Sequence, residues 1–280
     1  MDTKYFIFKF NIIMHSKITI ITVVKNGMPY LPNCLKSYEL QDYKNKNLIV
    51  VYSESRDQTL EFLKKKKNQG IIDKLIIDNH SRNKFGALNI ALDNVESDYF
   101  GILHADDIFF SPDTLSKIVN KFDEEKKIEV IFGNVIFCSK ENIINFKRFW
   151  KSSEFKKEKL SYGWMPPHTS IFLKRNFLNL RYDANYHISA DYNYILQLFE
   201  KNPRTFFYDR VITLMRLGGD STGFSTFYIK FLQDFKIIQT MFKNLVFLRL
   251  MLKIIRKLNQ FFFSKKKFSI DKNYIKQFKT

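Results

Sequence analysis

The stretch Tyr99-Phe-Gly-Ile-Leu-His-Ala-Asp-Asp107 is the most informative part of the sequence, because it runs an apolar strand directly into two adjacent carboxylates. In an open α/β sheet, ligands bind at the carboxyl ends of the parallel strands, and carboxylate oxygens there suit Mg²⁺ or Mn²⁺. A strand that ends in an ordinary polar turn, with Asp107 capping the next segment, explains these residues equally well when they are taken alone.

The preceding residues repeat this pattern of apolar strand and polar strand end. The runs 18–24, 47–52 and 74–78 are rich in Ile, Leu and Val, and each is followed by polar or turn-forming residues. Apolar residues at helical spacing follow the first two runs, and residues 85–92 form the next predicted helix. Strands that alternate with helices predict an α/β fold with a mostly parallel sheet and helices on both faces.

Spaced motifs in this region resemble the nucleotide-sugar half of family-two glycosyltransferases. They are Thr22-Val-Val-Lys-Asn26, Leu35-Lys-Ser37 with Gln41 and Tyr43, Ile49-Val-Val51 with Ser55, Asp57 and Thr59, and Ala87-Leu-Asn89 ahead of Asp106-Asp107. Three later motifs resemble the acceptor half of the branch that builds bacterial surface polysaccharides, of the colanic-acid type. These are Pro167-His-Thr169, Ala190-Asp-Tyr192 and Gly218-Gly-Asp-Ser221.

The resemblance implies a GT-A fold with a Rossmann-like sheet, and inverting transfer of a sugar from a nucleotide-diphosphate sugar. The acceptor would be a hydroxyl of a glycan or a polyprenyl-linked molecule in cell-surface polysaccharide synthesis. Residues 17–225 would form the catalytic domain, with the nucleotide-sugar half at about 17–110 and the acceptor half at about 111–225. Residues 1–16 are then an N-terminal extension, and residues 226–280 a basic helical tail.

The resemblance also implies roles for individual residues. The residues expected to contact the nucleotide sugar are Thr22, Val24, Asn26, Glu54, Asp57, Arg82, Asn89 and Asp106. Asp107 is expected to bind the divalent Mg or Mn ion directly, since a cation there would neutralise the charge that develops on the leaving diphosphate.

Inverting transfer also needs a base for the acceptor hydroxyl, and Asp191 is the candidate. It begins a predicted amphipathic helix, where the positive end of the helix favours a carboxylate. An ordinary acidic residue in a first helical turn would look the same.

Two further residues are expected to contact the acceptor or the diphosphate. His168 follows two prolines, and neutral imidazole can meet a ligand or a metal, although a lone histidine is more often structural. Gly219 lies in a Gly-Gly loop that permits a close backbone approach to a ligand, although a plain turn has the same composition.

Some positions depart from the family pattern. Tyr52 stands where relatives usually carry an Asp that pairs with the base, and residues 83–91 differ from the usual diphosphate-facing loop, so that Arg82 or Lys84 would supply its positive charge. A non-catalytic nucleotide-sugar-binding relative of the same fold is therefore an alternative. A sugar nucleotidyltransferase is less favoured, because residues 25–29 are not the Gly-rich basic loop that it needs.

The formal net charge of +18 is concentrated near the C-terminus, where residues 226–280 hold 13 Lys and Arg but only two Asp. Apolar residues recur there every three or four positions, which predicts one or two amphipathic helices, with Lys253 among the basic residues outside the apolar stripe. Such helices bind anionic membranes, and residues 246–267 are expected to do so, although part of the stripe would pack on the catalytic domain. No nucleic-acid-binding motif accompanies the charge.

The remaining features indicate a cytoplasmic protein, peripheral on the inner face of the cell membrane. Only Cys34 and Cys138 are present, which indicates a reducing compartment. Lys9 and Asn11 interrupt the apolar N-terminal segment, which is too short to span a bilayer, and Met14 is an alternative start. The donor sugar, the acceptor, the linkage and the oligomeric state stay open.

Overall fold

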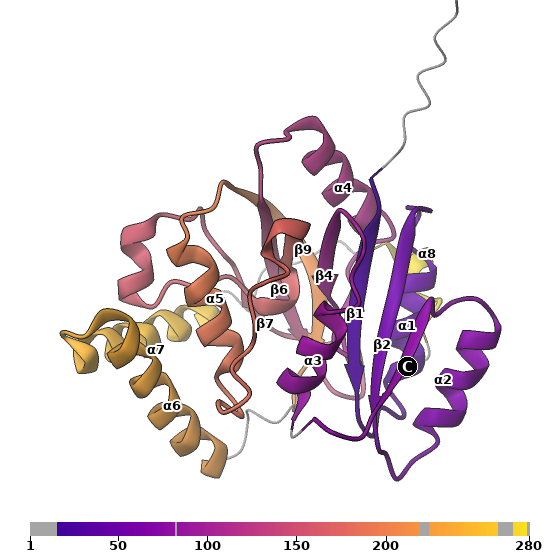
Figure 1. Cartoon of the computed structure of the whole chain (residues 1–280), viewed down its shortest axis with the longest axis horizontal. Helices are drawn as coiled ribbons and strands as arrows, with labels where there is room; N and C mark the ends of the chain where they lie inside the picture. The colour runs from indigo at the N-terminus through magenta and orange to yellow at the C-terminus, as the bar shows by residue number, and fades with distance from the viewer. Residues whose placement is uncertain (1–15, 82, 219–223, 263–270, 279–280) are drawn as a thin grey trace, which may run out of the picture.

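A nine-stranded sheet forms the centre of the part of the chain that the computed structural model describes, which is residues 16–81, 83–218, 224–262 and 271–278 (Figure 1). In sheet order the strands are β3 (Lys74–Asp78), β2 (Lys46–Ser53), β1 (Ile18–Val24), β4 (Tyr99–Ile102), β8 (Ile171–Lys174), β6 (Val130–Cys138), β9 (Thr205–Arg216) and β5 (Ile108–Phe109), with β7 (Phe146–Trp150) beside β6.

The first four strands of this order pair in parallel. β1 lies between β2 and β4, with Val24 opposite Tyr52 and Ile21 opposite Ile102, and β3 adds outside β2. The carboxyl ends of β1 and β4 therefore meet at one edge of the sheet. The other half is mixed, because β8 is antiparallel to both β4 and β6, while β9 is parallel to β6. The predicted α/β architecture is confirmed.

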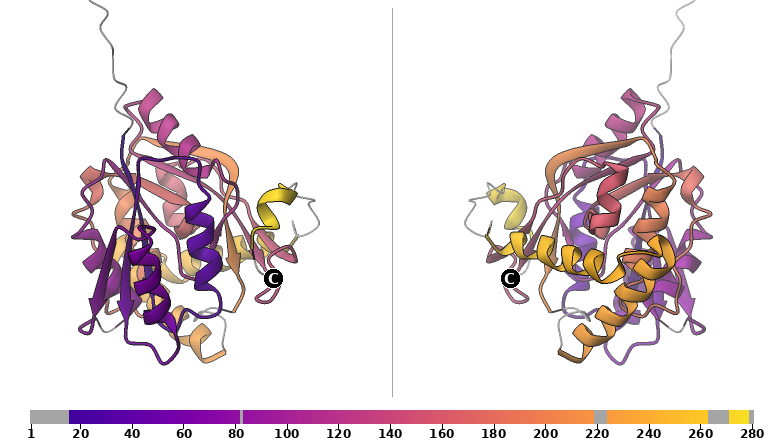
Figure 2. Two further views of the ribbon diagram at one scale, coloured as in Figure 1. Left: turned by 90° about the vertical axis from the view of Figure 1, so that its right-hand side faces the viewer. Right: turned by 90° about the vertical axis from the view of Figure 1, so that its left-hand side faces the viewer.

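Helices cover both faces of the sheet, as the alternation along β1 requires. Ile18 and Ile20 face a core shared with α1 (Leu31–Glu39), α2 (Thr59–Asn68) and α4 (Thr114–Glu124). Ile21 and Val23 face the opposite core, which is shared with α3 (Lys84–Leu92), α5 (Ala190–Glu200), α6 (Phe224–Phe242) and α7 (Val246–Phe262). Figure 2 shows α1 and α2 from one side of the molecule and α6 and α7 from the other.

Short elements complete the chain. They are the 3₁₀ turns η1 (Lys157–Tyr162), η2 (His168–Ser170) and η3 (Arg175–Phe177), and the helix α8 (Lys272–Ile275). Asp271 caps α8 by accepting hydrogen bonds from the N–H groups of Asn273 and Tyr274. The Tyr274 hydroxyl donates to the Phe109 carbonyl over 3.0 Å, which fixes α8 beside β5.

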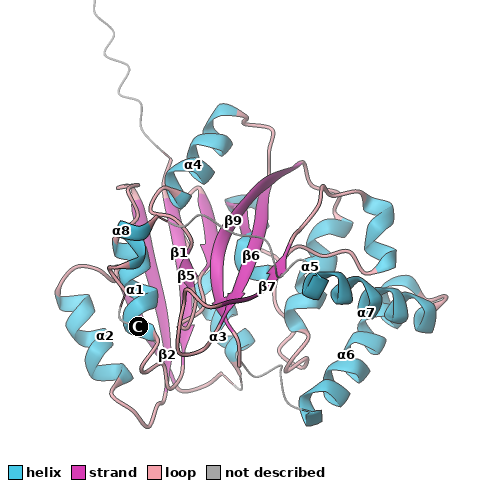
Figure 3. Ribbon diagram, turned by 180° about the vertical axis from the view of Figure 1, so that it is seen from behind, coloured by secondary structure: helices cyan, strands magenta, loops and turns pink. Residues whose placement is uncertain are grey.

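The helices α6 and α7 pack on one of the two cores of the sheet. Ile237, Ile238 and Leu250 are each 1% exposed and belong to the same core cluster as α5. Figure 3 shows α7 beside β7, and α7 also contacts η1. Residues 263–267, the end of the segment expected at a membrane, lie outside the described residues, as do residues 1–15.

Lys253 corrects one expectation about these helices. It was predicted among the basic residues outside the apolar stripe, on a helix expected at a membrane surface, but it is only 2% exposed. Its Nζ lies 2.6 Å from a carboxylate oxygen of Asp234 on α6 and 3.1 Å from the centre of the Tyr192 ring on α5. A buried cation needs such partners, so the charge of Lys253 points into the molecule and joins α5, α6 and α7.

The contact between η1 and α7 can be tested at Gly163, which ends η1. Gly163 has φ +75°, and a Cβ there would lie 2.5 Å from the Cα of Lys253. Gly70 has φ +73°, but a Cβ there would meet nothing within 4 Å. In Gly70→Ala we expect only the cost of the left-handed backbone, roughly 1 kcal/mol of unfolding free energy.

In Gly163→Ala we expect a further loss of about 1–3 kcal/mol, because the new methyl group collides with α7. Denaturant unfolding of both variants measures the difference. Equal losses would mean that α7 does not pack against η1 in solution.

Candidate active site

A cavity of about 720 Å³ opens at the edge of the sheet where β1 and β4 end. Its walls come from the loops after these strands, from η2, the start of α5, the end of β9, and from α6 and α7. The cavity brings together most of the predicted site residues that the structure describes. They are Val24, Asn26, Asp106, Asp107, His168 and Asp191.

Asp107 is the most constrained of these side chains. It is 1% exposed, and its Oδ2 is buried without a hydrogen-bond partner in the described part of the chain. Burial and the neighbouring Asp106 raise the pKa of Asp107 well above its usual value, against the opposing influence of Arg216, whose backbone N–H donates to the carboxylate. The folded chain thus buries a carboxylate whose charge it does not fully compensate.

A divalent cation fits this arrangement. Within the described residues, no group of three or more His, Cys, Asp or Glu side chains is arranged to hold a metal. Mg²⁺ commonly takes only one or two carboxylates and completes its shell with phosphate oxygens and water. The orphaned Oδ2 of Asp107 fits such a cation, with Asp106 as the second carboxylate in the cavity wall.

Asp191 lies in the first turn of α5 and lines the cavity. Its Oδ1 accepts a hydrogen bond of 2.7 Å from the N–H of Tyr192. Burial would raise the pKa of Asp191, but the positive charge of Lys230 on α6, the nearby His168 and Lys84, and the hydrogen bond from Tyr192 together hold the pKa below its usual value. Asp191 is therefore an ionised carboxylate at neutral pH, which is the state that can accept a proton.

Two neutral histidines also line the cavity. The rings of His104 and His168 are 5.7 Å apart, and burial lowers the pKa of His104 to about 3 and that of His168 to about 4. The Nε2 of His168 is 2.6 Å from the hydroxyl of Tyr182, whose ring stacks on Tyr194. His168 is thus held in place as a polar, uncharged part of the wall.

Some predicted contact residues lie outside the lining of the cavity. The hydroxyl of Thr22 donates to the Leu103 carbonyl over 2.9 Å, and Glu54 is exposed to solvent. Asp57 accepts hydrogen bonds from the N–H of Met28 and from Thr59, so it holds the loop after β1.

Asn89 also lies outside the cavity. It uses both ends of its amide on the backbone of Tyr182, so it fixes α3 against the segment that carries the partner of His168. Arg82 and Gly219 lie outside the described residues. The predicted ligand contacts of all these residues stay predictions.

Apart from Lys84, which the altered loop at residues 83–91 had already indicated, the basic residues of the site are not revealed by the motifs. Lys84 and Arg216 line the cavity near Asp107, while Lys230, Lys253 and Lys257 reach it from α6 and α7. The Arg216 guanidinium donates to the Lys140 carbonyl over 2.9 Å. Lys230, Lys253 and Lys257 carry no local signal, because the packing of the tail helices brings them to the site.

Sequence comparison places the chain among glycosyltransferases. The family model described as Glycosyl transferase family 2 matches residues 19–187. A PGL/p-HBAD biosynthesis glycosyltransferase of Mycobacterium tuberculosis is 27% identical over 189 residues, which cover 66% of this chain and 70% of that protein. A teichoic acid poly(glycerol phosphate) polymerase of Staphylococcus epidermidis is 32% identical over 153 residues, but these cover 48% of this chain and 21% of that one.

Solved structures support the same fold. The structure of residues 1–349 of S. aureus TarS has a TM-score of 0.62 at 16% identity, and the match covers 89% of this chain and 75% of that one. The chain spans 44% of the longer TarS structure. The mannosyltransferase PcManGT of Pyrobaculum calidifontis, in complex with GDP-Man and Mn²⁺, has a TM-score of 0.56 at 15% identity, with coverages of 94% and 69%.

The family model covers more than half of the sequence, and the sheet, the covering helices and the carboxylates at the strand ends agree with it. The expected GT-A fold is confirmed. The chain therefore belongs to glycosyl transferase family 2.

Proposed function

We propose that the protein transfers a sugar, with inversion, from a nucleotide-diphosphate sugar to a hydroxyl of a glycan or lipid-linked acceptor in surface glycoconjugate synthesis. The observation that carries this proposal is the pair of carboxylates in one cavity, with Asp107 buried at the end of β4 and Asp191 at the start of α5. Similar structures include a TarS complex with UDP-GlcNAc and the PcManGT complex with GDP-Man and Mn²⁺, which support a nucleotide-sugar donor and a divalent metal.

The two ends of the cavity would have different tasks. Asp107, with Asp106, would hold the divalent cation, and Lys84 and Arg216 would add positive charge near the leaving diphosphate. When bound, the cation would supply electrostatic stabilisation of that leaving group. Asp191 would take the proton of the acceptor hydroxyl. The oxygen of that hydroxyl would meanwhile bond to the anomeric carbon, on the face opposite the diphosphate. The bond from that carbon to the diphosphate oxygen breaks, and its electron pair stays on the diphosphate.

Asp107→Asn tests the metal role. Because the pKa of Asp107 is raised in the folded protein, the folded state holds this proton more tightly than the unfolded chain does. Stability therefore falls as the pH rises above about 4, where the unfolded side chain ionises. Without metal, we expect the Asn variant to unfold at a higher temperature than wild type at pH 7, with the advantage disappearing towards pH 4.

The same variant should lose metal-dependent nucleotide binding in titration calorimetry, because the neutral amide is a poor ligand for a hard cation. Asp73→Asn, in the turn before β3, is the control, since it removes a carboxylate away from the cavity. Unchanged metal-dependent binding in Asp107→Asn would contradict the assignment.

Asp191→Asn tests the base. The amide keeps the shape of the side chain but cannot accept the proton, so we expect the turnover number to fall by about 10²–10⁴-fold. Donor affinity should stay within about twofold of wild type. Release of nucleoside diphosphate from a nucleotide sugar, together with direct donor titration, measures both quantities. An equal loss of donor binding and turnover would remove Asp191 from the role of base.

We also propose that α7 rests on an anionic membrane. No helix in the described ranges is long and apolar enough to cross a bilayer. The outer side of α7 nevertheless exposes large apolar side chains, including Phe247 at 64% and Leu248 at 51%. Ile255, two turns after Leu248 on the same side of the helix, is 55% exposed, and the net charge of +18 favours anionic lipid headgroups under such an apolar surface.

The double substitution Phe247→Ser and Leu248→Ser should weaken binding to phosphatidylglycerol vesicles by at least about tenfold. Burying each apolar side chain in the membrane would contribute roughly 1.5–3 kcal/mol to the binding free energy. Ile144→Ser, at a residue 54% exposed in the turn before β7, is the matched control and should bind as wild type does. Vesicle co-sedimentation measures both. Binding that survives the double substitution would place the contact elsewhere.

A further inference from the structure

The charge of the active-site cavity exceeds what the donor needs. Among the described residues that line it, four carboxylates face eight basic side chains, which are Lys25, Lys84, Lys140, Arg148, Arg216, Lys230, Lys253 and Lys257. A nucleotide-diphosphate sugar carries about two negative charges on its diphosphate, and a divalent cation would cancel them. The positive excess would therefore remain when donor and metal are both bound, so it calls for a second anion.

Part of this excess is concentrated at the helical end of the cavity. Asp234 already pairs with Lys253 at 2.6 Å and lies 3.8 Å from Lys230, so these two lysines share one carboxylate. Lys257 makes no ion pair with any residue that the structure describes. Burial, and then the charge of Lys230, lower the pKa of Lys257 to about 8. Holding such a cation away from water is costly unless an anion joins it.

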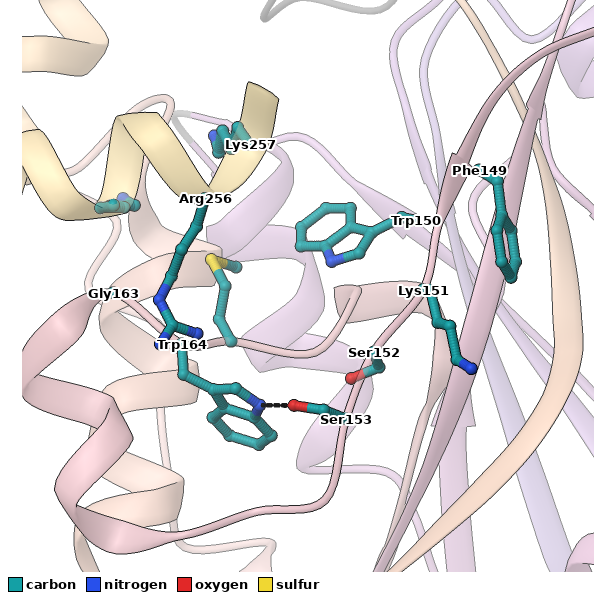
Figure 4. A pocket seen from close by; sticks show the side chains of 11 residues that line it. Phe149, Trp150, Lys151, Ser152, Ser153, Gly163, Trp164, Arg256 and Lys257 are labelled. Atoms are coloured by element: carbon teal, nitrogen blue, oxygen red, sulfur yellow. Dashed lines mark hydrogen bonds between the residues drawn. The ribbon is translucent and has the colours of Figure 1, made fainter. Parts of the chain in front are cut away.

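A second, smaller cavity of about 250 Å³ adjoins this end (Figure 4). It shares Trp150, Met165, Lys253 and Lys257 with the larger cavity, so the two are neighbours along α7. Figure 4 shows Arg256 extending from α7 towards Trp164, with Lys257 next to it on the same helix.

Hydroxyl groups complete the wall of the side cavity. The indole N–H of Trp164 donates to the Ser153 hydroxyl over 3.0 Å. The Oγ of Ser152 is buried without a hydrogen-bond partner among the described residues, and Ser152 is 7% exposed. The cavity thus combines cations, aromatic rings and a hydroxyl that has no described partner.

We propose that this side cavity is an acceptor subsite for a phosphate group, so that the acceptor is a phosphorylated glycan or a lipid phosphate. The inference rests on the proposed transferase function. Arg256 and Lys257 would pair with the phosphate, whose several charged oxygens suit a guanidinium and an ammonium group together. The Trp150 ring would offer an apolar face to the adjoining sugar. A carboxylate would neutralise less of the positive excess than a phosphate does.

The first test measures binding of inorganic phosphate in EDTA, at constant ionic strength, by the shift in melting temperature and by calorimetry. We expect phosphate to stabilise the wild-type protein. Lys257→Met and Arg256→Met should each bind phosphate at least about tenfold more weakly. Lys236→Met is the matched control, because it removes the same charge from an exposed position on α6 outside both cavities, and it should bind as wild type does.

Two results would overturn the proposal. One is the absence of phosphate binding to the wild-type protein. The other is equal binding by Lys257→Met, Arg256→Met and Lys236→Met, which would place the phosphate elsewhere. Metal-dependent nucleotide binding is measured in parallel and should persist in all three variants. A wild-type protein that binds nucleotide with metal but not phosphate in EDTA would refute the subsite alone, and one that binds no nucleotide would refute the proposed function.

A second arm separates the sources of the phosphate. Wild type and Lys257→Met are compared on phosphatidylcholine vesicles with and without polyprenyl phosphate, and with soluble glucose 1-phosphate. If wild type binds the vesicles with polyprenyl phosphate more tightly than Lys257→Met does, the phosphate is that of a lipid. If wild type binds glucose 1-phosphate more tightly than Lys257→Met does, the phosphate is that of a glycan. Equal binding of both probes by wild type and Lys257→Met would contradict an acceptor subsite.

Discussion

The burial of Asp107 at the end of β4 is the constraint on which the rest of the site depends. Its carboxylate is 1% exposed, one oxygen has no described hydrogen-bond partner, and burial beside Asp106 raises its pKa. An isolated group of this kind destabilises a fold, so its presence is explained best by a ligand that compensates the charge. The parallel ends of β1 and β4, and the end of β9 with Arg216, form the walls around that position.

The helices α6 and α7 bring a second set of charges to the site. The buried Lys253–Asp234 pair and the Tyr192 ring fix these helices against α5, whose first turn carries Asp191. A buried ion pair adds little net stability, because desolvation offsets its attraction, but it does fix geometry. The same packing turns basic residues of α7 towards the cavity and leaves apolar ones such as Phe247 facing outward. Under the proposed function, this pair of helices would serve both the acceptor and a membrane surface.

The sequence alone predicts the framework but not the electrostatics. The strands β1 to β3 and the helix α3 follow from apolar patterning, and the place of Asp107 follows from the shared edge of parallel strands, whereas the expectation that Asp191 joins it comes from the family resemblance. Contacts between distant segments carry no such signal, so the bonds from Asn89 to Tyr182 could not be foreseen. An amphipathic pattern also cannot tell whether its basic side meets solvent or a cavity, so the burial of Lys253 could not be foreseen.

The proposed function requires a cation that joins the carboxylates at the strand ends to the diphosphate of a nucleotide sugar. A thermal-shift comparison of the wild-type protein with UDP, GDP, TDP and CMP, each in Mn²⁺ and in EDTA, tests it most directly. Ligand at about a hundred times its dissociation constant stabilises the fold by about 2.7 kcal/mol, which is readily measured. We predict a clear shift with one nucleotide in Mn²⁺ that disappears in EDTA. The absence of any shift, or an equal shift in EDTA, would contradict the role of the cation.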